Sequence, residues 1–214
     1  MLLEQERIQV ARALDRVFGD QIVQITAWGP PAMFLDAART QIALMVGFHG
    51  ESGIDAEMAP NRLAILTDSV DAVFLPHTLE RHSDPHGVLR EVHRILRPDG
   101  KVIILGFNPF SWWGLRHKFS PSGFPGGLSR QITKSRLSDW LNLLNLTIET
   151  VYPCYASRAE SRATMLVRRL QLFASSYILV ASKETIPVTI IRPRVSRRAR
   201  LVESLVNPTT RNAA

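Results

Sequence analysis

The chain has 214 residues, of which 45% are hydrophobic and 21% are charged. This composition is typical of one folded domain with an appendage and excludes a collagen-like or largely disordered protein. The single cysteine, Cys154, excludes an intrachain disulfide framework and favours a reducing compartment such as the cytoplasm. Acidic residues near the N-terminus and the lack of an apolar run of about 18 residues argue against a signal peptide and a transmembrane segment.

The net charge of +7 is concentrated in the C-terminal part of the chain. Residues 183–214 contain seven basic and two acidic residues, a net charge of +5, so residues 1–182 keep only +2. The arginines between Arg192 and Arg200 would bind an anionic membrane surface or nucleic acid, or would belong to a solvated tail without a partner. We therefore predict a folded domain at 1–182 and a basic tail at 183–214.

The first elements expected along the chain are a helix, a strand, a turn and a second helix. Apolar residues at helical spacing predict a helix over residues 3–18, and residues 21–26 predict a short strand. Gly29 and the two prolines after it predict a turn, with a second helix beginning near Pro31. The apolar run at 41–46 predicts a strand that is buried on both faces.

Strands and helices continue to alternate through the rest of the domain. Residues 49–62 predict a loop, Asp84 is a suitable N-cap, and the aperiodic segment at 108–130, rich in Pro, Gly and Trp, predicts a lid. The predicted strands are 70–75, 101–107, 146–152 and 175–181, and the predicted helices are 85–96 and 132–144. This order predicts an α/β fold with a doubly wound, mainly parallel sheet and a final antiparallel strand.

The most informative stretch of the sequence lies between residues 67 and 104. Residues 67–71 read TDSVD, residues 77–81 read HTLER at the end of a predicted strand, and residues 89–100 read LREVHRILRPDG before the next strand. This order closely resembles the middle of class I S-adenosylmethionine-dependent methyltransferases of the type 11, ubiquinone-biosynthesis-like group. The resemblance implies a Rossmann-like fold and S-adenosylmethionine as the cofactor.

Two side chains of this stretch are candidates for the site. In an open α/β sheet, ligands bind at the carboxyl ends of the strands, so His77 and Glu80 would border the cleft as cofactor-binding or catalytic residues. The alternative is that His77 bonds backbone groups at the strand end and Glu80 pairs with a basic neighbour such as Arg81. Glu91 and Arg94, three residues apart on a helix, are expected to form a structural ion pair.

The glycine-rich turn that the family has after its first strand is altered in this chain. The equivalent residues 24–31 read QITAWGPP, so only Gly29 is a glycine, while Thr26 and Trp28 occupy expected small positions. The family turn lets the backbone approach the cofactor without a Cβ in the way. The Trp28 indole would either stack on the adenine or fill the pocket.

The predicted second strand also lacks the carboxylate that binds the ribose hydroxyls in the family. His49 lies near that place, and Glu51, two residues further on, is the alternative acid. The region 58–61, which reads MAPN, offers no clear equivalent of the acid that often contacts the adenine. The cofactor-binding residues implied by the resemblance are therefore Thr26, Trp28, Gly29, His49, Glu51 and His77.

Methyl transfer requires few acid–base groups, because positioning an acceptor in line with an activated methyl group supplies much of the rate. Asn108 is the polar residue nearest the end of the strand at 101–107 and joins His77 and Glu80 as a catalytic candidate. Aromatic residues of the expected lid, Trp112 and Trp113 among them, suit a planar or apolar substrate, or they pack the lid onto the domain.

Three functions remain compatible with the sequence. The first is a methyltransferase acting on a small, aromatic or lipid-like molecule. The second is a catalytically inactive member of the fold with a regulatory or scaffolding role, and the third is an RNA- or DNA-associated methyltransferase that uses the basic tail. Scattered histidines do not indicate a metal site, and Cys154 is expected to be a buried, inert thiol.

Overall fold

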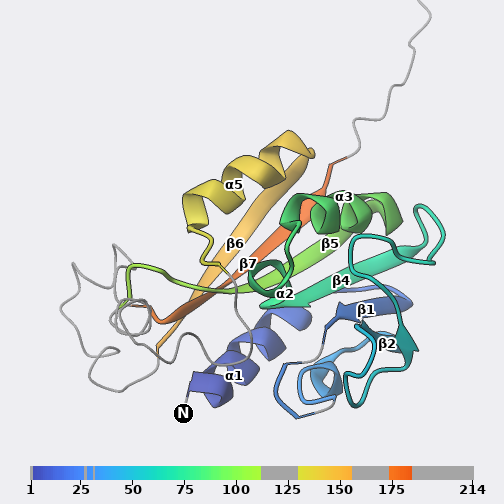
Figure 1. Ribbon diagram of the computed structural model, residues 1–214, viewed down its shortest axis with the longest axis horizontal. Coiled ribbons are helices and arrows are strands. Elements are labelled where there is room, and N and C mark those ends of the chain that lie inside the picture. Colours follow the sequence, from blue (N-terminus) through green and yellow to red (C-terminus); the bar gives the residue numbers. More distant parts are fainter. Residues whose placement is uncertain (1, 27, 31, 112–129, 156–173, 185–214) are drawn as a thin grey trace, which may run out of the picture.

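A computed structural model describes residues 2–26, 28–30, 32–111, 130–155 and 174–184. Seven strands form one sheet in the order β3-β2-β1-β4-β5-β7-β6 (Figure 1). Their bounds are β1 Gln21–Ile25, β2 Ile42–Gly47, β3 Ala56–Glu57, β4 Val70–Pro76, β5 Leu96–Phe107, β6 Leu146–Cys154 and β7 Ser176–Lys183. Neighbouring strands are parallel from β3 to β5, whereas β7 is antiparallel to both β5 and β6. The predicted mainly parallel sheet with a final antiparallel strand is confirmed.

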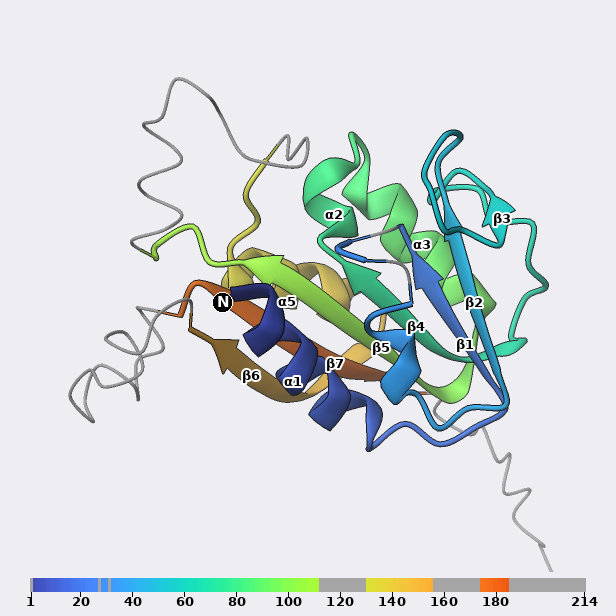
Figure 2. The same ribbon diagram turned by 90° about the horizontal axis from the view of Figure 1, so that it is seen from below.

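Helices cover both faces of the sheet (Figures 1 and 2). Helix α1 (Leu2–Leu14) packs on one face, where its apolar side chains join those of β1, β4, β5 and β7 in one buried core. Helices α3 (Pro85–Ile95) and α5 (Lys134–Leu143) pack on the other face and form a second core. This two-sided burial explains why the central strands are almost continuously apolar.

The predicted helix after β1 is wrong. The described residues there form turns and a single 3-10 turn, η1 (Leu35–Ala37). Ala32 has a left-handed backbone with φ 59°, which a right-handed helix cannot contain. Burial of Phe34 against Phe74, with ring centroids 5.4 Å apart, fixes the segment without regular helical hydrogen bonds.

The structure also differs from the sequence-based expectations in two short elements and in the ends of others. The predicted loop at 49–62 contains the edge strand β3, and the short helix α2 (Thr78–Arg81), which periodicity does not predict, follows β4. Strand β5 begins directly after α3 rather than at residue 101. The other predicted strands and helices are confirmed, with ends shifted by a few residues.

Local contacts that the sequence predicts are present. The Asp84 carboxylate accepts a hydrogen bond from the Gly87 amide at 2.9 Å and caps α3. Arg94 and Glu91 form an ion pair at 2.8 Å. Cys154 is buried, and burial raises the pKa of its thiol to about 12, so the thiol is protonated and inert at neutral pH.

Lys183 at the end of β7 is a buried lysine with three acceptors. Its ammonium donates to the Asp68 carboxylate at 2.7 Å and to the carbonyls of His93 and Leu96 at 2.9 and 2.7 Å. Replacing it by methionine leaves these two carbonyls, at the C-terminal end of α3, unpaired. We expect Lys183→Met to lower the free energy of unfolding by about 3 kcal/mol in urea denaturation.

Lys101→Met is the matched control for that substitution, because Lys101 pairs with Glu149 nearer the surface. Its expected effect is below about 1 kcal/mol. Equal losses for the two variants would contradict the role assigned to the Lys183 ammonium.

Parts of the predicted organisation lie outside the described residues. These are most of the expected lid, including Trp112 and Trp113, and the basic tail from residue 185 onward, including Arg192 to Arg200. Among the helices that the structure describes, none is long and apolar enough to span a membrane.

Candidate functional site

The strand order changes direction between β1 and β4, because the chain passes from β1 outward to β2 and β3 and then returns to β4 and β5. Ligands of doubly wound sheets bind in the crevice outside the carboxyl ends of the strands at such a switch point. Thr26 and Trp28 follow β1 and His77 follows β4, so three of the predicted site residues lie at this crevice.

The turn after β1 keeps a left-handed backbone although its first glycine is replaced. Thr26 has φ 71° and is fully buried, and its amide donates to the Val46 carbonyl at 2.7 Å. Its hydroxyl lies 3.0 Å from the hydroxyl of Thr78, which donates to the Ile25 carbonyl at 2.6 Å. These bonds offset the strain of the left-handed threonine and fix the turn against α2.

Gly29 is the one position of this turn where glycine is retained. It has φ 74°, and a Cβ there would lie 3.3 Å from the Leu3 side chain of α1. Any larger residue would be strained and would press on the helix. Gly29 therefore allows α1 to approach the turn closely.

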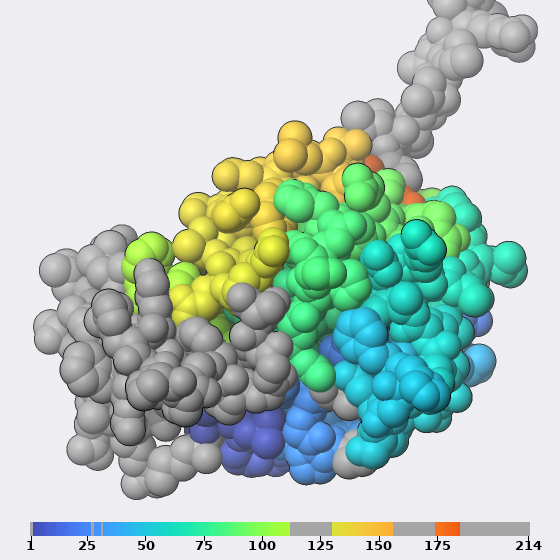
Figure 3. Space-filling view, viewed as in Figure 1, coloured from blue at the N-terminus to red at the C-terminus, as the bar shows by residue number. Residues whose placement is uncertain are grey.

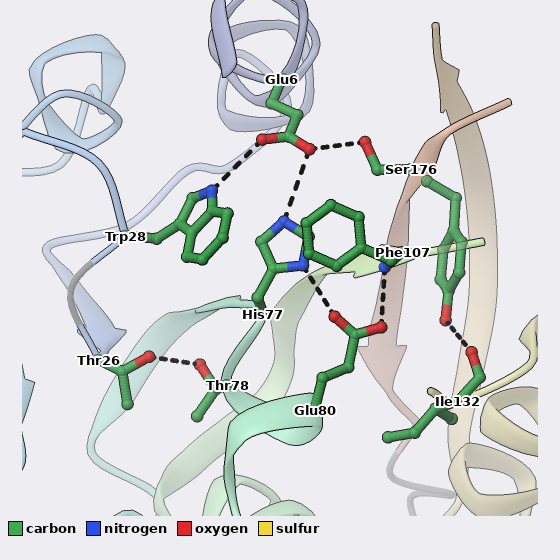
Figure 4. Close-up of polar contacts among 10 residues, drawn as sticks. Glu6, Thr26, Trp28, His77, Thr78, Glu80, Phe107, Ile132 and Ser176 are labelled. Atoms are coloured by element: carbon green, nitrogen blue, oxygen red, sulfur yellow. Dashed lines mark hydrogen bonds and ion pairs between the residues drawn. The ribbon is translucent and has the colours of Figure 1, made fainter. Parts of the chain in front are cut away.

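A buried cluster of ionisable side chains lies next to the turn (Figure 4). The imidazole of His77 lies between two carboxylates: its Nδ1 is 2.8 Å from Glu80 Oε2, and its Nε2 is 3.5 Å from Glu6 Oε1. All three side chains are at most 3% exposed. Glu80 also accepts a hydrogen bond from the Phe107 amide at 2.8 Å, which ties α2 to the end of β5.

Glu6 joins this cluster from α1. It accepts a hydrogen bond from the Ser176 hydroxyl at 2.7 Å and another from the Trp28 indole N–H at 3.4 Å. The indole is half-buried, with its ring centroid 4.4 Å from that of His77 and 5.8 Å from that of Phe107. His77 also stacks on Phe107, at a centroid distance of 3.8 Å. The side chains therefore form one packed unit across the ends of β1, β4, β5 and β7.

Burial and pairing shift the pKa values of the cluster residues in opposite directions. Burial disfavours the imidazolium, but the hydrogen bonds and charges of Glu6 and Glu80 outweigh it and raise the pKa of His77. Burial disfavours the Glu6 carboxylate, but its bonds to His77, Ser176 and Trp28 lower its pKa below the ordinary range. Burial is the main cause that raises the pKa of Glu80.

The directions of the pKa shifts of Glu6 and His77 predict how the stability of the fold depends on pH. The pKa of Glu6 is lowered on folding, so its contribution is present above its unfolded value of 4.5 and lost as pH falls through the folded value. The pKa of His77 is raised, so its contribution is complete below 6.5 and lost as pH rises through the folded value. We expect the thermal unfolding midpoint to fall as pH rises above 6.5, and to fall less steeply in His77→Gln. Parallel pH profiles for the two proteins would contradict this assignment.

A second acidic group lies at the end of β2. Gly47 has no side chain, and a Cβ there would collide with the Glu51 carboxylate, so Glu51 occupies the space next to the last residue of the strand. Glu51 pairs with Arg81 of α2 at 3.1 Å, and its side chain is 13% exposed. The loop after β2 and the segment after β4 thus meet at the surface (Figure 3). Phe48 of the first segment stacks on His82 of the second.

The structure brings together some predicted site residues and separates others. Thr26, Trp28, His77 and Glu80 lie in one unit, and Glu51 lies over Gly47 at the end of the neighbouring strand β2. His49, in contrast, has a side chain that is 93% exposed and pairs with Glu57 of β3. The side chain of Asn108 bonds the Ala174 carbonyl and the Phe110 amide, so it holds the segment after β5.

The contacts of His77 and Arg81 bear on the alternative reading of these residues. The His77 ring lies between the carboxylates of Glu6 and Glu80, where the alternative reading placed backbone groups. Arg81, which the alternative reading paired with Glu80, forms an ion pair with Glu51.

Sequence reasoning missed Glu6. A signal for it exists, because residue 6 lies at helical spacing between the apolar residues Leu3 and Val10. An acid on the buried stripe of a helix requires a buried partner.

Comparisons with known proteins agree with this architecture. The sequence model of a methyltransferase domain matches residues 10–104. The uncharacterized protein YafS of Escherichia coli strain K12 is 33% identical over 168 residues, which cover 73% of this chain and 66% of that protein, just under two thirds of its length.

Two solved structures of S-adenosylmethionine-dependent methyltransferases share the fold. The protein from Thermotoga maritima has a TM-score of 0.65 at 16% identity, with 86% of this chain and 93% of that chain covered. The protein from Archaeoglobus fulgidus has a TM-score of 0.63 at 12% identity, with 84% and 94% covered. The fold is that of class I S-adenosylmethionine-dependent methyltransferases, and the match to the methyltransferase-domain model covers a little under half of this chain.

S-adenosylmethionine is the cofactor that the methyltransferase fold implies, and the residues after β1 and β2 would suit it. The left-handed turn at Thr26 keeps the backbone course that a glycine would give. The space above Gly47 is filled by the Glu51 carboxylate, which is an acceptor suited to a ribose diol. The Trp28 indole, which packs on His77, stands beside the turn where the family has a glycine.

Proposed function

We propose that this chain is a methyltransferase that binds S-adenosylmethionine across the carboxyl ends of β1, β2 and β4 and methylates a small aromatic or lipid-like molecule. The observation that supports it most directly is the Glu51 carboxylate held over Gly47 at the end of β2, beside the left-handed turn at Thr26 that bonds to the same strand. An acid at the end of the second strand and a close turn after the first are the two features that nucleotide binding requires of this fold.

Each residue has a role in this proposal. Glu51 accepts hydrogen bonds from the ribose hydroxyls, and its ion pair with Arg81 fixes the direction of the carboxylate. The turn at Thr26 and Gly29 brings backbone amides to the cofactor, and Trp28 covers the methionine end. When bound, the cofactor would supply a methyl group on a positively charged sulfur, and the sulfur would leave when an acceptor lone pair bonds to the methyl carbon.

His77 and Glu80 act on this site by positioning. Both are at most 2% exposed, so their contacts are with neighbouring side chains and the backbone. His77 supports the indole, and Glu80 holds the start of the segment after β5 through Phe107. That segment, with Asn108 and the exposed Phe110, borders the side where an acceptor would enter.

Calorimetric titration of the full chain with S-adenosylmethionine and with S-adenosylhomocysteine tests this function. We expect binding of both, followed by methyl transfer from labelled cofactor to members of an aromatic and lipid-like compound set. Absence of heat and of any melting shift at millimolar ligand would end the proposal.

A catalytically inactive protein of the same fold is the second candidate. The observation that favours it is Trp28, a large residue at a glycine position with its indole packed on His77. In that case the fold would serve a regulatory or scaffolding role, and the titration would show no cofactor binding. A role for the arginines from Arg192 to Arg200 is tested separately, by liposome and RNA pull-down with and without residues 190–214.

A further inference from the structure

The exposed apolar side chains of the domain are concentrated at one end of the sheet. Of the six large apolar residues that are exposed in the described part of the chain, four lie next to the start of a strand. They are Phe18 before β1, Ile42 at the start of β2, Leu66 before β4 and Leu143 before β6. β1, β2 and β4 are parallel, and β6 has the same direction because β7 is antiparallel to both β5 and β6. All four residues therefore lie at the amino end of the sheet, opposite the crevice.

These side chains contribute little to the stability of the fold. Phe18, Leu66 and Leu143 are each 80% exposed or more. An apolar side chain stabilises a fold in proportion to the area that it removes from water, and these side chains remove little. Single exposed apolar residues are common on protein surfaces, but their concentration at one end of a domain indicates a contact with a partner or a membrane.

The basic tail begins at the same end of the sheet. β7 ends at Lys183, and the Glu184 amide donates to the carbonyl of Asn145, directly before β6, at 3.3 Å. Residues 185–214 then contain six arginines and one acid, a net charge of +5. The positive charge of the chain is thus attached where the exposed apolar side chains lie.

The domain and the tail supply different parts of a binding surface. The charges that line the hollow beside Phe18 balance, because Arg16 and Lys101 face two acids, Asp71 and Asp99. Attraction to an anionic partner therefore comes from the tail, whereas the domain supplies apolar groups. Apolar insertion together with a polybasic segment gives stable binding to an anionic membrane, where either signal alone binds weakly.

The spacing of the apolar residues favours a lipid surface over a protein or an RNA. Phe18 and Leu143 precede strands that are four places apart in the sheet, about 19 Å at the usual spacing of strands. Arg97 and Lys101 of β5 lie between these strands. A protein partner would find no continuous apolar core there, and RNA phosphates offer nothing to an aliphatic side chain. In a bilayer interface, each apolar side chain can enter among the headgroups separately.

We propose that the amino end of the sheet docks on an anionic lipid bilayer. Its four exposed apolar side chains enter the headgroup region, and the arginines of the tail bind lipid phosphates. The crevice lies at the carboxyl ends of the parallel strands, so the docked domain keeps it open to water. This surface is separate from the proposed cofactor site and does not depend on methyl transfer.

Sedimentation of the full chain with lipid vesicles tests the docking. The vesicles contain phosphatidylcholine alone, or phosphatidylcholine and phosphatidylglycerol in equal amounts. We expect binding to the mixed vesicles only, and weaker binding at high salt because salt screens the arginines. Replacing Phe18 and Leu66 together by serine should lower the partition onto mixed vesicles by about tenfold with the tail intact. Phe110→Ser is the matched control, because Phe110 is 73% exposed but follows β5 at the crevice end, and it should leave the partition unchanged.

Each result decides the inference. A partition of the Phe18→Ser, Leu66→Ser variant within twofold of that of the unmodified protein would overturn it, because the tail alone would then account for binding. An equal loss in Phe110→Ser would also overturn it, and so would equal binding to the two kinds of vesicle, or binding of the full chain to RNA but not to mixed vesicles. If circular dichroism shows that the double variant does not fold, Leu143→Ser decides alone. None of these results bears on the binding of S-adenosylmethionine, so the proposed function stands or fails separately.

Discussion

Replacing Glu80 by alanine is expected to lower the free energy of unfolding by about 3–5 kcal/mol, the largest loss among the substitutions considered. The reason is that two buried groups depend on this carboxylate. His77 Nδ1 lies 2.8 Å from one oxygen, and the Phe107 amide donates to the other at 2.8 Å. With alanine, a buried amide and a buried imidazole each lose a partner in a place that water does not reach. Urea denaturation followed by circular dichroism measures the change.

Glu80→Gln separates hydrogen bonding from charge. Its amide oxygen can still accept from Phe107, and its NH₂ group can donate to the Nδ1 of a neutral imidazole. Its loss should therefore be smaller, about 1 kcal/mol. Glu149→Gln, which weakens the ion pair with Lys101 nearer the surface, provides the matched control. If Glu80→Ala were no more destabilising than Glu149→Gln, the cluster would not hold the strand ends together.

The second large effect is expected on cofactor affinity. Glu51→Ala should weaken the binding of S-adenosylmethionine and of adenosine by about 10- to 100-fold, the range for losing a hydrogen bond to a charged group. The physical basis is the position of the carboxylate over Gly47 at the end of β2, where the proposal has it accept hydrogen bonds from the ribose.

Glu57→Gln is the control for this substitution. Glu57 is also an acid near the end of β2, but its side chain is half-exposed and pairs with the exposed His49. We expect cofactor affinity to change less than twofold. If Glu57→Gln weakened binding as much as Glu51→Ala, then His49 and Glu57, rather than Glu51, would hold the ribose. His49 remains a predicted contact until that measurement.

The sequence predicts those site residues whose position follows from the order of the strands. The ends of β1 and β4 lie together in any sheet of this topology, so Trp28 and His77 could be assigned to the crevice from the sequence. Glu51 could be named only as an alternative to His49, because the course of a loop after a strand does not follow from its composition. The glycine at 47, read together with an acid four residues later, is the local signal that favours Glu51.

Local sequence patterns were sufficient to predict the helices and strands whose formation is local. Apolar spacing determined α1, α3 and the central strands, and Asp84 determined the start of α3, because periodicity and capping act over a few residues. By contrast, long-range packing makes the described residues after β1 form no regular helix and holds Thr26 in a left-handed turn. The same is true of the contact of Glu6 with His77, Trp28 and Ser176, which joins segments up to 170 residues apart. Such contacts depend on how helices and strands pack, and no local pattern contains that information.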